Sequence, residues 1–137
     1  MNDLLQFLHD RLTEDEQAAH AATWDDQSGT WTARPPRASY ERYTVVDYCD
    51  DGVVAVTPEN ADADGVGQHV ARHDPDRVLR EVEAKRHILD SHIPDAASAD
   101  EQINEEWRSG SALADDLLRL LALPYVDHPD YKDAWRP

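Results

Sequence analysis

The segment formed by residues 68–90 is the stretch that most constrains the fold. Asp74 occupies a helix N-cap position, and Pro75 supplies the fixed φ angle that suits the first residue of a helix. The chain then runs to residue 91 without a glycine or a further proline, so we predict a helix over residues 75–91. The apolar residues on one face of this helix are Val78, Leu79, Val82 and Leu89.

Two cations interrupt this apolar face. Arg86 lies within it, and Lys85 lies at its edge. A helix face that packs on a core tolerates cations when carboxylates pair with them. A first predicted helix, over residues 3–22, has such carboxylates, because Asp15 falls in the middle of its apolar arc and Glu16 at the border. We predict that the two helices pack through an ion pair between these groups; the alternative is that Asp15 only marks the end of the buried part.

The region of residues 30–57 has the composition of β-structure. Residues 40–48 alternate and are rich in β-forming side chains, and Asp51-Gly52 is a hairpin signal before the apolar residues 53–56. We predict a small antiparallel sheet of two strands, with a third at the start of the region. Two strands alone are marginally stable, so this sheet must pack on the helices.

The remaining segments complete an α+β fold in one domain over residues 1–137. Residues 58–67 are expected to be a loop; they resemble the start of a calcium-binding loop but lack the glutamate that its twelfth position requires. Residues 92–110 are expected to be a polar connection. A third helix is predicted over residues 111–123, and a short helix over residues 129–135.

Four aromatic residues are candidates for contacts with a partner or for sealing the core. Trp24 and Trp31 flank the predicted sheet and are expected to cover its buried face, with ligand stacking as the alternative. Tyr131 and Trp135 share one face of the short helix and are expected to seal the C-terminal segment onto the core, with an interaction role as the alternative.

The charge of the chain restricts its partners. With 13 basic and 29 acidic residues, the net charge at neutral pH is −16. Binding to a nucleic-acid backbone depends on clustered Lys and Arg, so direct nucleic-acid binding is not expected. A basic protein partner, or mimicry of nucleic-acid charge, is compatible with this charge. The single cysteine, Cys49, excludes an internal disulfide framework, and no segment approaches a membrane span, so we expect a cytoplasmic protein without membrane contact.

The sharpest candidate for chemistry is the pair His69 and His73. A spacing of four residues places both imidazoles on one helix face, where they could hold zinc or another divalent metal ion. The pair lacks the general base of the HExxH motif, because Val70 follows His69. The alternative is that His73 caps a helix and His69 is a surface residue. No other cofactor is predicted.

Two long blocks of the sequence resemble a family of small uncharacterised proteins of actinobacteria and their phages. The blocks are RHDPDRVLREVEAKRHIL and LRLLALPYVDHPDYKDAW, which match the family signatures HIARHDPxRVLxEVEAKR and TLRLLALPYADHPDYREEW. Residues 4–22 also resemble the opening helix of that family. The resemblance implies no activity. Members with a Cys-containing insertion before the second block suggest metal binding in those proteins, but this chain has the acidic segment of residues 95–108 there.

These observations support three functional hypotheses. The first is a non-enzymatic, acidic accessory module that binds another protein, or a second copy of itself, through a sheet edge or the Trp-bearing segments. The second is a metal-binding protein or metalloenzyme that uses His69 and His73. The third is an acidic nucleic-acid mimic that inhibits a basic partner. The sequence favours a non-enzyme, since it contains neither a GxSxG nor a phosphate-binding glycine motif.

Overall fold

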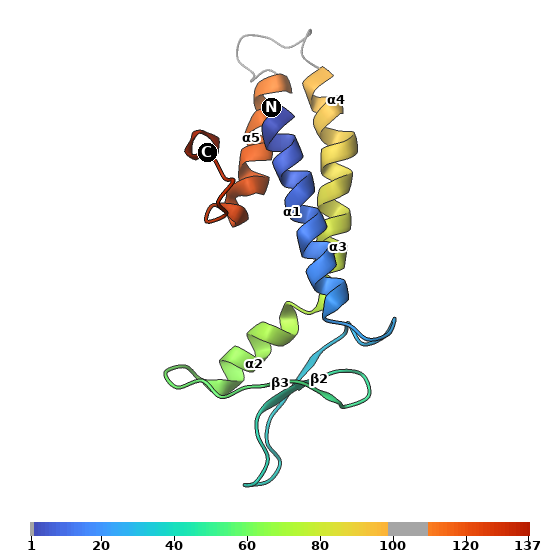
Figure 1. Ribbon diagram of the computed structural model, residues 1–137, viewed down its shortest axis with the longest axis vertical. Helices are drawn as coiled ribbons and strands as arrows, with labels where there is room; N and C mark the ends of the chain where they lie inside the picture. Colours follow the sequence, from blue (N-terminus) through green and yellow to red (C-terminus); the bar gives the residue numbers. More distant parts are fainter. Residues whose placement is uncertain (1, 99–109) are drawn as a thin grey trace. The chain divides into compact units, whose positions relative to one another are not determined.

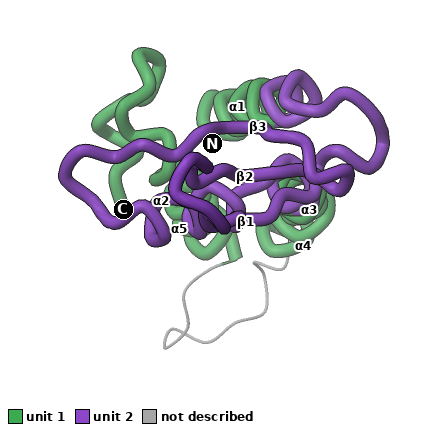
Figure 2. The backbone as a smooth tube through the Cα atoms, turned by 90° about the horizontal axis from the view of Figure 1, so that it is seen from below, with its two compact units in different colours: residues 1–15, 81–137 green, residues 16–80 purple. Residues whose placement is uncertain are grey.

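The computed structural model describes residues 2–98 and 110–137, and its fold is α+β, as predicted (Figure 1). Helices predominate, and the sheet is small and antiparallel. The chain consists of two compact units: residues 1–15 and 81–137 form unit 1, and residues 16–80 form unit 2 (Figure 2). Within the described residues, the helices are too short or too polar to cross a membrane.

Unit 1 contains most of helix α1 (Asn2–Ala21). Three leucines at helical spacing, Leu4, Leu8 and Leu12, are at most 2% exposed, which confirms the predicted apolar face. Phe7 is also buried, although it lies outside that face, because the C-terminal segment covers it. Among the described residues of this unit, the other buried apolar side chains are Val82, Leu89, Ile93, Ala114, Leu118 and Ala122.

The second long helical segment extends further than the sequence indicated. Helix α3 (Pro75–His87) leads into a π-helical turn, η1 (Ile88–His92), and α4 (Ile93–Ser98) follows without a break (Figure 1). The expectation of a polar connection over residues 92–110 is therefore wrong for residues 93–98, which form α4. Residues 99–109 of that expected connection lie outside the described residues.

Packing and a proline explain this continuation. Leu89 and Ile93 are both 2% exposed, so the apolar pattern of the helix continues past its expected end. Pro94 would clash with the carbonyl group four residues earlier in a regular α-helix. The wider π-helical turn directly before it relieves this clash and lets the helical path continue.

The C-terminal part of unit 1 begins with helix α5 (Gly110–Ala122), which confirms the predicted third helix within one residue and contacts α4. A 3₁₀ turn, η2 (Leu123–Tyr125), follows it. The short helix expected over residues 129–135 is reduced to a single 3₁₀ turn, η3 (Asp133–Trp135). Between these two 3₁₀ turns, the backbone N–H groups of Val126, His128 and Tyr131 bond to carbonyl groups three residues earlier. Each of these bonds closes a separate turn, so no α-helix forms in this segment.

Unit 2 contains the sheet, in the order β1 (Thr32–Arg34), β2 (Thr44–Val46), β3 (Gly52–Ala55), with both pairs antiparallel. Helix α2 (Ala63–Arg72) contacts β1 and β2, so the sheet packs on a helix as predicted. The buried residues of this core are Tyr43, Val45, Val56 and Ala71, and the partly buried residues that pack on them are Trp31, Ala33, Ala63, Val66 and Val70.

The turn between β2 and β3 lies earlier than the sequence indicated. We predicted a turn at Asp51-Gly52, but Gly52 is the first residue of β3. Instead, Asp50 has the positive φ angle, 63°. The reason is local: the side chain of Asp47 accepts the backbone N–H groups of Cys49 and Asp51, and this side-chain turn outcompetes the Asp-Gly turn.

The loop expected over residues 58–67 is wrong for its second half, where α2 begins. Asp62 caps this helix, because its carboxylate accepts the N–H of Gly65 at 2.8 Å. Gly67 lies against the Tyr43 ring, so closely that an added Cβ would overlap it. Two glycines lower the helix propensity of this segment, and the tertiary contact with Tyr43 offsets that cost.

The N-terminus of α3 has the capping arrangement that the sequence predicts. One oxygen of Asp74 accepts the N–H of Arg77 at 2.9 Å, and Pro75 is the first helical residue. The other oxygen accepts the N–H of Trp31 at 3.1 Å. Asp74 thus joins the start of the helix to the start of the sheet region in unit 2.

Candidate protein-binding site

Two exposed aromatic rings stack on each other in unit 2. Trp24 is 64% exposed and Tyr48 is 47% exposed. Their ring centroids are 5.9 Å apart, and their planes differ by 19°. Together with Asp25 and Asp47, which bind them, we call these residues the Trp24–Tyr48 patch. The patch combines two large apolar faces with two carboxylates.

Asp47 fixes the position of the indole ring. This carboxylate is only 6% exposed, and one of its oxygens accepts the indole N–H of Trp24 at 3.0 Å. Its other oxygen accepts the N–H groups of Cys49 and Asp51 at 2.9 and 3.1 Å. The hydrogen bond from Trp24 lowers the pKa of Asp47 and outweighs the effect of desolvation, which raises it. The two backbone N–H groups lower this pKa further, so it lies below its ordinary value.

Asp25 fixes the phenol ring. The hydroxyl of Tyr48 donates to Asp25 at 2.5 Å, and the backbone N–H groups of Gln27 and Ser28 donate to its other oxygen. Desolvation opposes the charge, but these hydrogen bonds together lower the pKa of Asp25. The bond to Asp25 also raises the pKa of Tyr48. The Ser28 hydroxyl accepts the N–H of Trp24 at 2.8 Å, which closes the loop that carries the patch.

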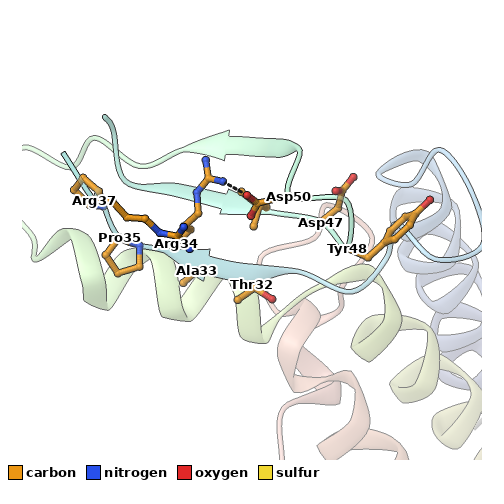
Figure 3. A pocket seen from close by; sticks show the side chains of 10 residues that line it. Thr32, Ala33, Arg34, Pro35, Arg37, Asp47, Tyr48 and Asp50 are labelled. Atoms are coloured by element: carbon orange, nitrogen blue, oxygen red, sulfur yellow. Dashed lines mark hydrogen bonds and ion pairs between the residues drawn. The ribbon is translucent and has the colours of Figure 1, made fainter. Parts of the chain in front are cut away.

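A groove of about 550 Å³ extends from the patch along the sheet (Figure 3). Figure 3 shows Tyr48 at one end of the groove and Arg37 at the other. Between them, Arg34 forms an ion pair with Asp50 at 2.5 Å. The residues that line the groove are Thr32, Ala33, Arg34, Pro35, Pro36, Arg37, Val46, Asp47, Tyr48 and Asp50.

The second predicted tryptophan has a different environment. Trp31 is partly buried and packs on the core of unit 2, and its indole N–H donates to the carbonyl of Ser28 at 3.0 Å. Trp31 therefore covers the core, as expected. The same expectation is wrong for Trp24, which is 64% exposed and whose indole N–H is held at the surface by Asp47. An interaction role for Trp31 stays a prediction.

The histidine pair comes together as the sequence predicted. His69 belongs to α2, and His73 is the residue that ends it. The centroids of the two imidazole rings are 4.4 Å apart. The ring of His73 lies with Nδ1 2.8 Å from the carbonyl oxygen of His69, so it caps the C-terminal end of the helix. In the described part of the chain, no group of three or more His, Cys, Asp or Glu side chains could hold a metal ion.

Asp15, one of the two acidic residues expected to meet the second helix, binds a tyrosine of the C-terminal segment. Asp15 accepts the hydroxyl of Tyr125 at 2.5 Å. The guanidinium of Arg86 lies 3.5 Å from the Thr13 hydroxyl. Ion pairing of Asp15 or Glu16 with Lys85 or Arg86 stays a prediction.

The C-terminal aromatic residues form a cluster in unit 1. Tyr131 and Trp135 pack against Phe7, with ring centroids 6.0 and 5.1 Å away, and against each other at 5.8 Å. The ammonium group of Lys132 lies 5.2 Å from the Trp135 ring. This arrangement seals the C-terminal segment onto α1, as expected. Binding of a partner by these rings stays a prediction.

Sequence reasoning missed the buried arginine at the centre of this cluster. Arg11 is 7% exposed and lies 5.0 Å from the centroid of the Phe7 ring. Its guanidinium donates to Nδ1 of His128 at 2.9 Å and lies 3.0 Å from the carboxylate of Glu14. The sequence does contain a signal for the burial of Arg11: this residue follows Leu4 by seven positions and therefore lies on the same helix face.

The fold and the patch define this chain as a small acidic α+β protein with an exposed, hydrogen-bonded pair of aromatic rings. It belongs to the family of unknown function DUF6221, whose family model matches residues 1–137. The resemblance to a family without an assigned activity is thereby confirmed. No curated protein and no solved structure matches the chain.

Proposed function

We propose that this protein is a non-enzymatic interaction module in which the Trp24–Tyr48 patch binds a basic segment of a partner protein. The observation that carries this proposal is the fixed position of two rings that are 64% and 47% exposed. Contact between apolar rings and water is unfavourable, and rigid, exposed aromatic side chains are typical of contact surfaces. Here both rings are held by carboxylates and are already arranged for a ligand.

The chemistry of the patch suits a Lys or Arg side chain. The face of an indole or phenol ring attracts a cation, by about 0.5–1 kcal/mol at an exposed site and about 2 kcal/mol when water is excluded. Asp25 and Asp47 have lowered pKa values, so both are ionised at neutral pH and add Coulombic attraction. The net charge of −16 would attract a basic partner over longer distances.

The hydrogen bonds of these carboxylates support binding over proton transfer. The oxygens of Asp47 accept three N–H groups, and those of Asp25 accept two N–H groups and one hydroxyl. A carboxylate with such partners and a lowered pKa is a weak general base near neutral pH. The patch is therefore better suited to hold a cation than to catalyse a reaction.

Titration calorimetry with a short Arg-rich peptide tests this proposal. Trp24→Ala should weaken binding by roughly 5- to 30-fold, which corresponds to about 1–2 kcal/mol. Tyr40→Ala is the matched control, because Tyr40 is also an aromatic residue of unit 2 and is 86% exposed. This control should bind like the unaltered protein. Equal binding by both variants would contradict the proposed site.

The same titration separates this proposal from the acidic-mimic hypothesis. A mimic binds through its overall charge, so its affinity would fall steeply with salt and would not depend on Trp24. Binding to a second copy would instead appear as a concentration-dependent mass in sedimentation experiments.

We also propose that the protein acts in the cytoplasm. The actinobacterial or phage origin that the resemblance implies also stays a prediction.

A further inference from the structure

We propose that His69 and His73 form a surface site for one divalent transition-metal ion, with copper(II) bound most tightly. This inference does not depend on the Trp24–Tyr48 patch. Both imidazoles are exposed, and they come from the last turn of α2 and the residue that ends it. Helical spacing brings their ring centroids to 4.4 Å. Two neutral imidazoles on one helix face are a common pair of ligands for such ions.

The hydrogen bond of His73 selects the tautomer that binds metal. Its Nδ1 lies 2.8 Å from the carbonyl oxygen of His69. A carbonyl oxygen only accepts hydrogen bonds, so Nδ1 carries the hydrogen and Nε2 of the neutral ring has a free lone pair. Metal-binding histidines almost always use their second nitrogen in this way, often toward a backbone carbonyl. His69 makes the ring contact with His73 and has no hydrogen bond from its ring within the described residues.

The separation of the rings suits two adjacent positions around one ion. An imidazole nitrogen binds a metal at about 2.0–2.1 Å, which places the ring centroid about 3.2 Å from the ion. Where the Nε2 atoms of both rings bind the same ion, centroids 4.4 Å apart subtend an angle of about 90° at that ion. This is the angle between neighbouring ligands in the tetragonal geometry of copper(II) and nickel(II), and copper(II) has the highest affinity for such nitrogen ligands.

The proposed site leaves coordination positions open. The described residues contain no group of three or more possible ligands, so two imidazoles are the protein ligands and water occupies the other positions. Affinity should therefore be lower than that of a closed structural site. The net charge of −16 attracts cations to the surface without specific ligands. Variants of the two histidines therefore distinguish binding at this site from attraction by the overall charge.

The test is a titration of tag-free, chelator-treated protein with copper(II) chloride, followed by calorimetry and electron paramagnetic resonance. We expect one equivalent of copper(II) with a two-nitrogen hyperfine pattern. His69→Gln keeps good helix propensity, and His73→Asn keeps a side-chain donor for the helix end. Each variant should weaken this binding by roughly tenfold or more and remove the two-nitrogen pattern.

Two variants act as controls. His20→Ala removes an exposed histidine of unit 2 that lies outside the pair. His92→Ala removes one ring from the other close pair, His87 and His92, whose centroids are 5.2 Å apart. Both control variants should still bind one equivalent of copper(II) and show the two-nitrogen hyperfine pattern. The proposal is overturned if the unaltered protein shows no nitrogen hyperfine pattern, or if His69→Gln binds copper(II) as tightly as the unaltered protein does.

Discussion

Replacement of Tyr125 by phenylalanine removes one hydroxyl group and leaves the ring in place. In unit 1, this hydroxyl donates to the carboxylate of Asp15 at 2.5 Å, and the ring lies edge-on to Phe7 at 6.3 Å. A hydrogen bond to a charged group contributes about 1.5–3 kcal/mol to stability. Both partners are only partly buried, so water can solvate Asp15 after the substitution. We therefore expect a loss of about 1.5 kcal/mol, at the lower end of that range.

Thermal denaturation measures this loss as a decrease of roughly 4–6 °C in Tm. A double-mutant cycle with Asp15→Ala isolates the hydrogen bond, and we expect a coupling energy of about 1 kcal/mol. Tyr40→Phe is the control, because Tyr40 is 86% exposed, and it should leave Tm unchanged. A coupling energy below about 0.3 kcal/mol would refute the reasoning, since the two losses would then be independent.

The same bond predicts how stability depends on alkaline pH. Burial, followed by the hydrogen bond to Asp15, raises the pKa of Tyr125 above its ordinary value of 10.0. The folded state therefore holds the phenolic proton more tightly than the unfolded state does. The contribution is complete below pH 10.0 and is lost as the pH rises above it. Tyr125→Phe should show a smaller loss of stability than the unaltered protein over that range.

Three further predictions concern the two cores and the patch. Gly67→Ala should lose about 1–3 kcal/mol in denaturant unfolding, because its Cβ overlaps the Tyr43 ring, whereas Gly65→Ala has ordinary contacts and should not destabilise α2. Leu118→Ala should lose about 2–5 kcal/mol, because Leu118 is 0% exposed, and Leu113→Ala, at 46% exposed, should lose less than half as much. The pKa values of the two patch carboxylates are lowered, so their contribution to stability is present above pH 3.8 and is lost as the pH falls through the folded values. The fluorescence of Trp24, measured as the difference between the unaltered protein and Trp24→Phe, should therefore change only below pH 3.8. Equal effects within either pair of variants, or a fluorescence change near neutral pH, would contradict these assignments.

The elements that depend on local signals are those that could be predicted from the sequence. The N-cap at Asp74 and the leucine spacing of α1 act over one or two helical turns, so neighbouring residues are sufficient to specify them. The approach of His69 and His73 also follows from helical spacing alone. Local chemistry thus accounts for α1, for the start of α3 and for the approach of the two imidazoles within one helical turn.

The features that the sequence did not reveal depend on contacts between distant residues. Helix α2 contains two glycines, which lower its helix propensity, and Gly67 packs directly on the ring of Tyr43, which lies 24 positions earlier in the sequence. The patch depends on Asp47, which binds an indole 23 residues away and also sets the hairpin turn. A carboxylate in an acidic chain gives no sequence signal that distinguishes such a role from that of a solvated surface charge.

The most direct test of the proposed function is a ¹H–¹⁵N NMR titration of the protein with a short Arg-rich peptide, observed at the indole N–H signals. We predict that the Trp24 indole signal and the amide signals of Cys49 and Asp51 shift together and saturate, because all three N–H groups bind the carboxylate of Asp47. The Trp135 indole should not shift. Small shifts spread over acidic residues throughout the chain, with Trp24 unchanged, would contradict the account and would assign the binding to net charge alone.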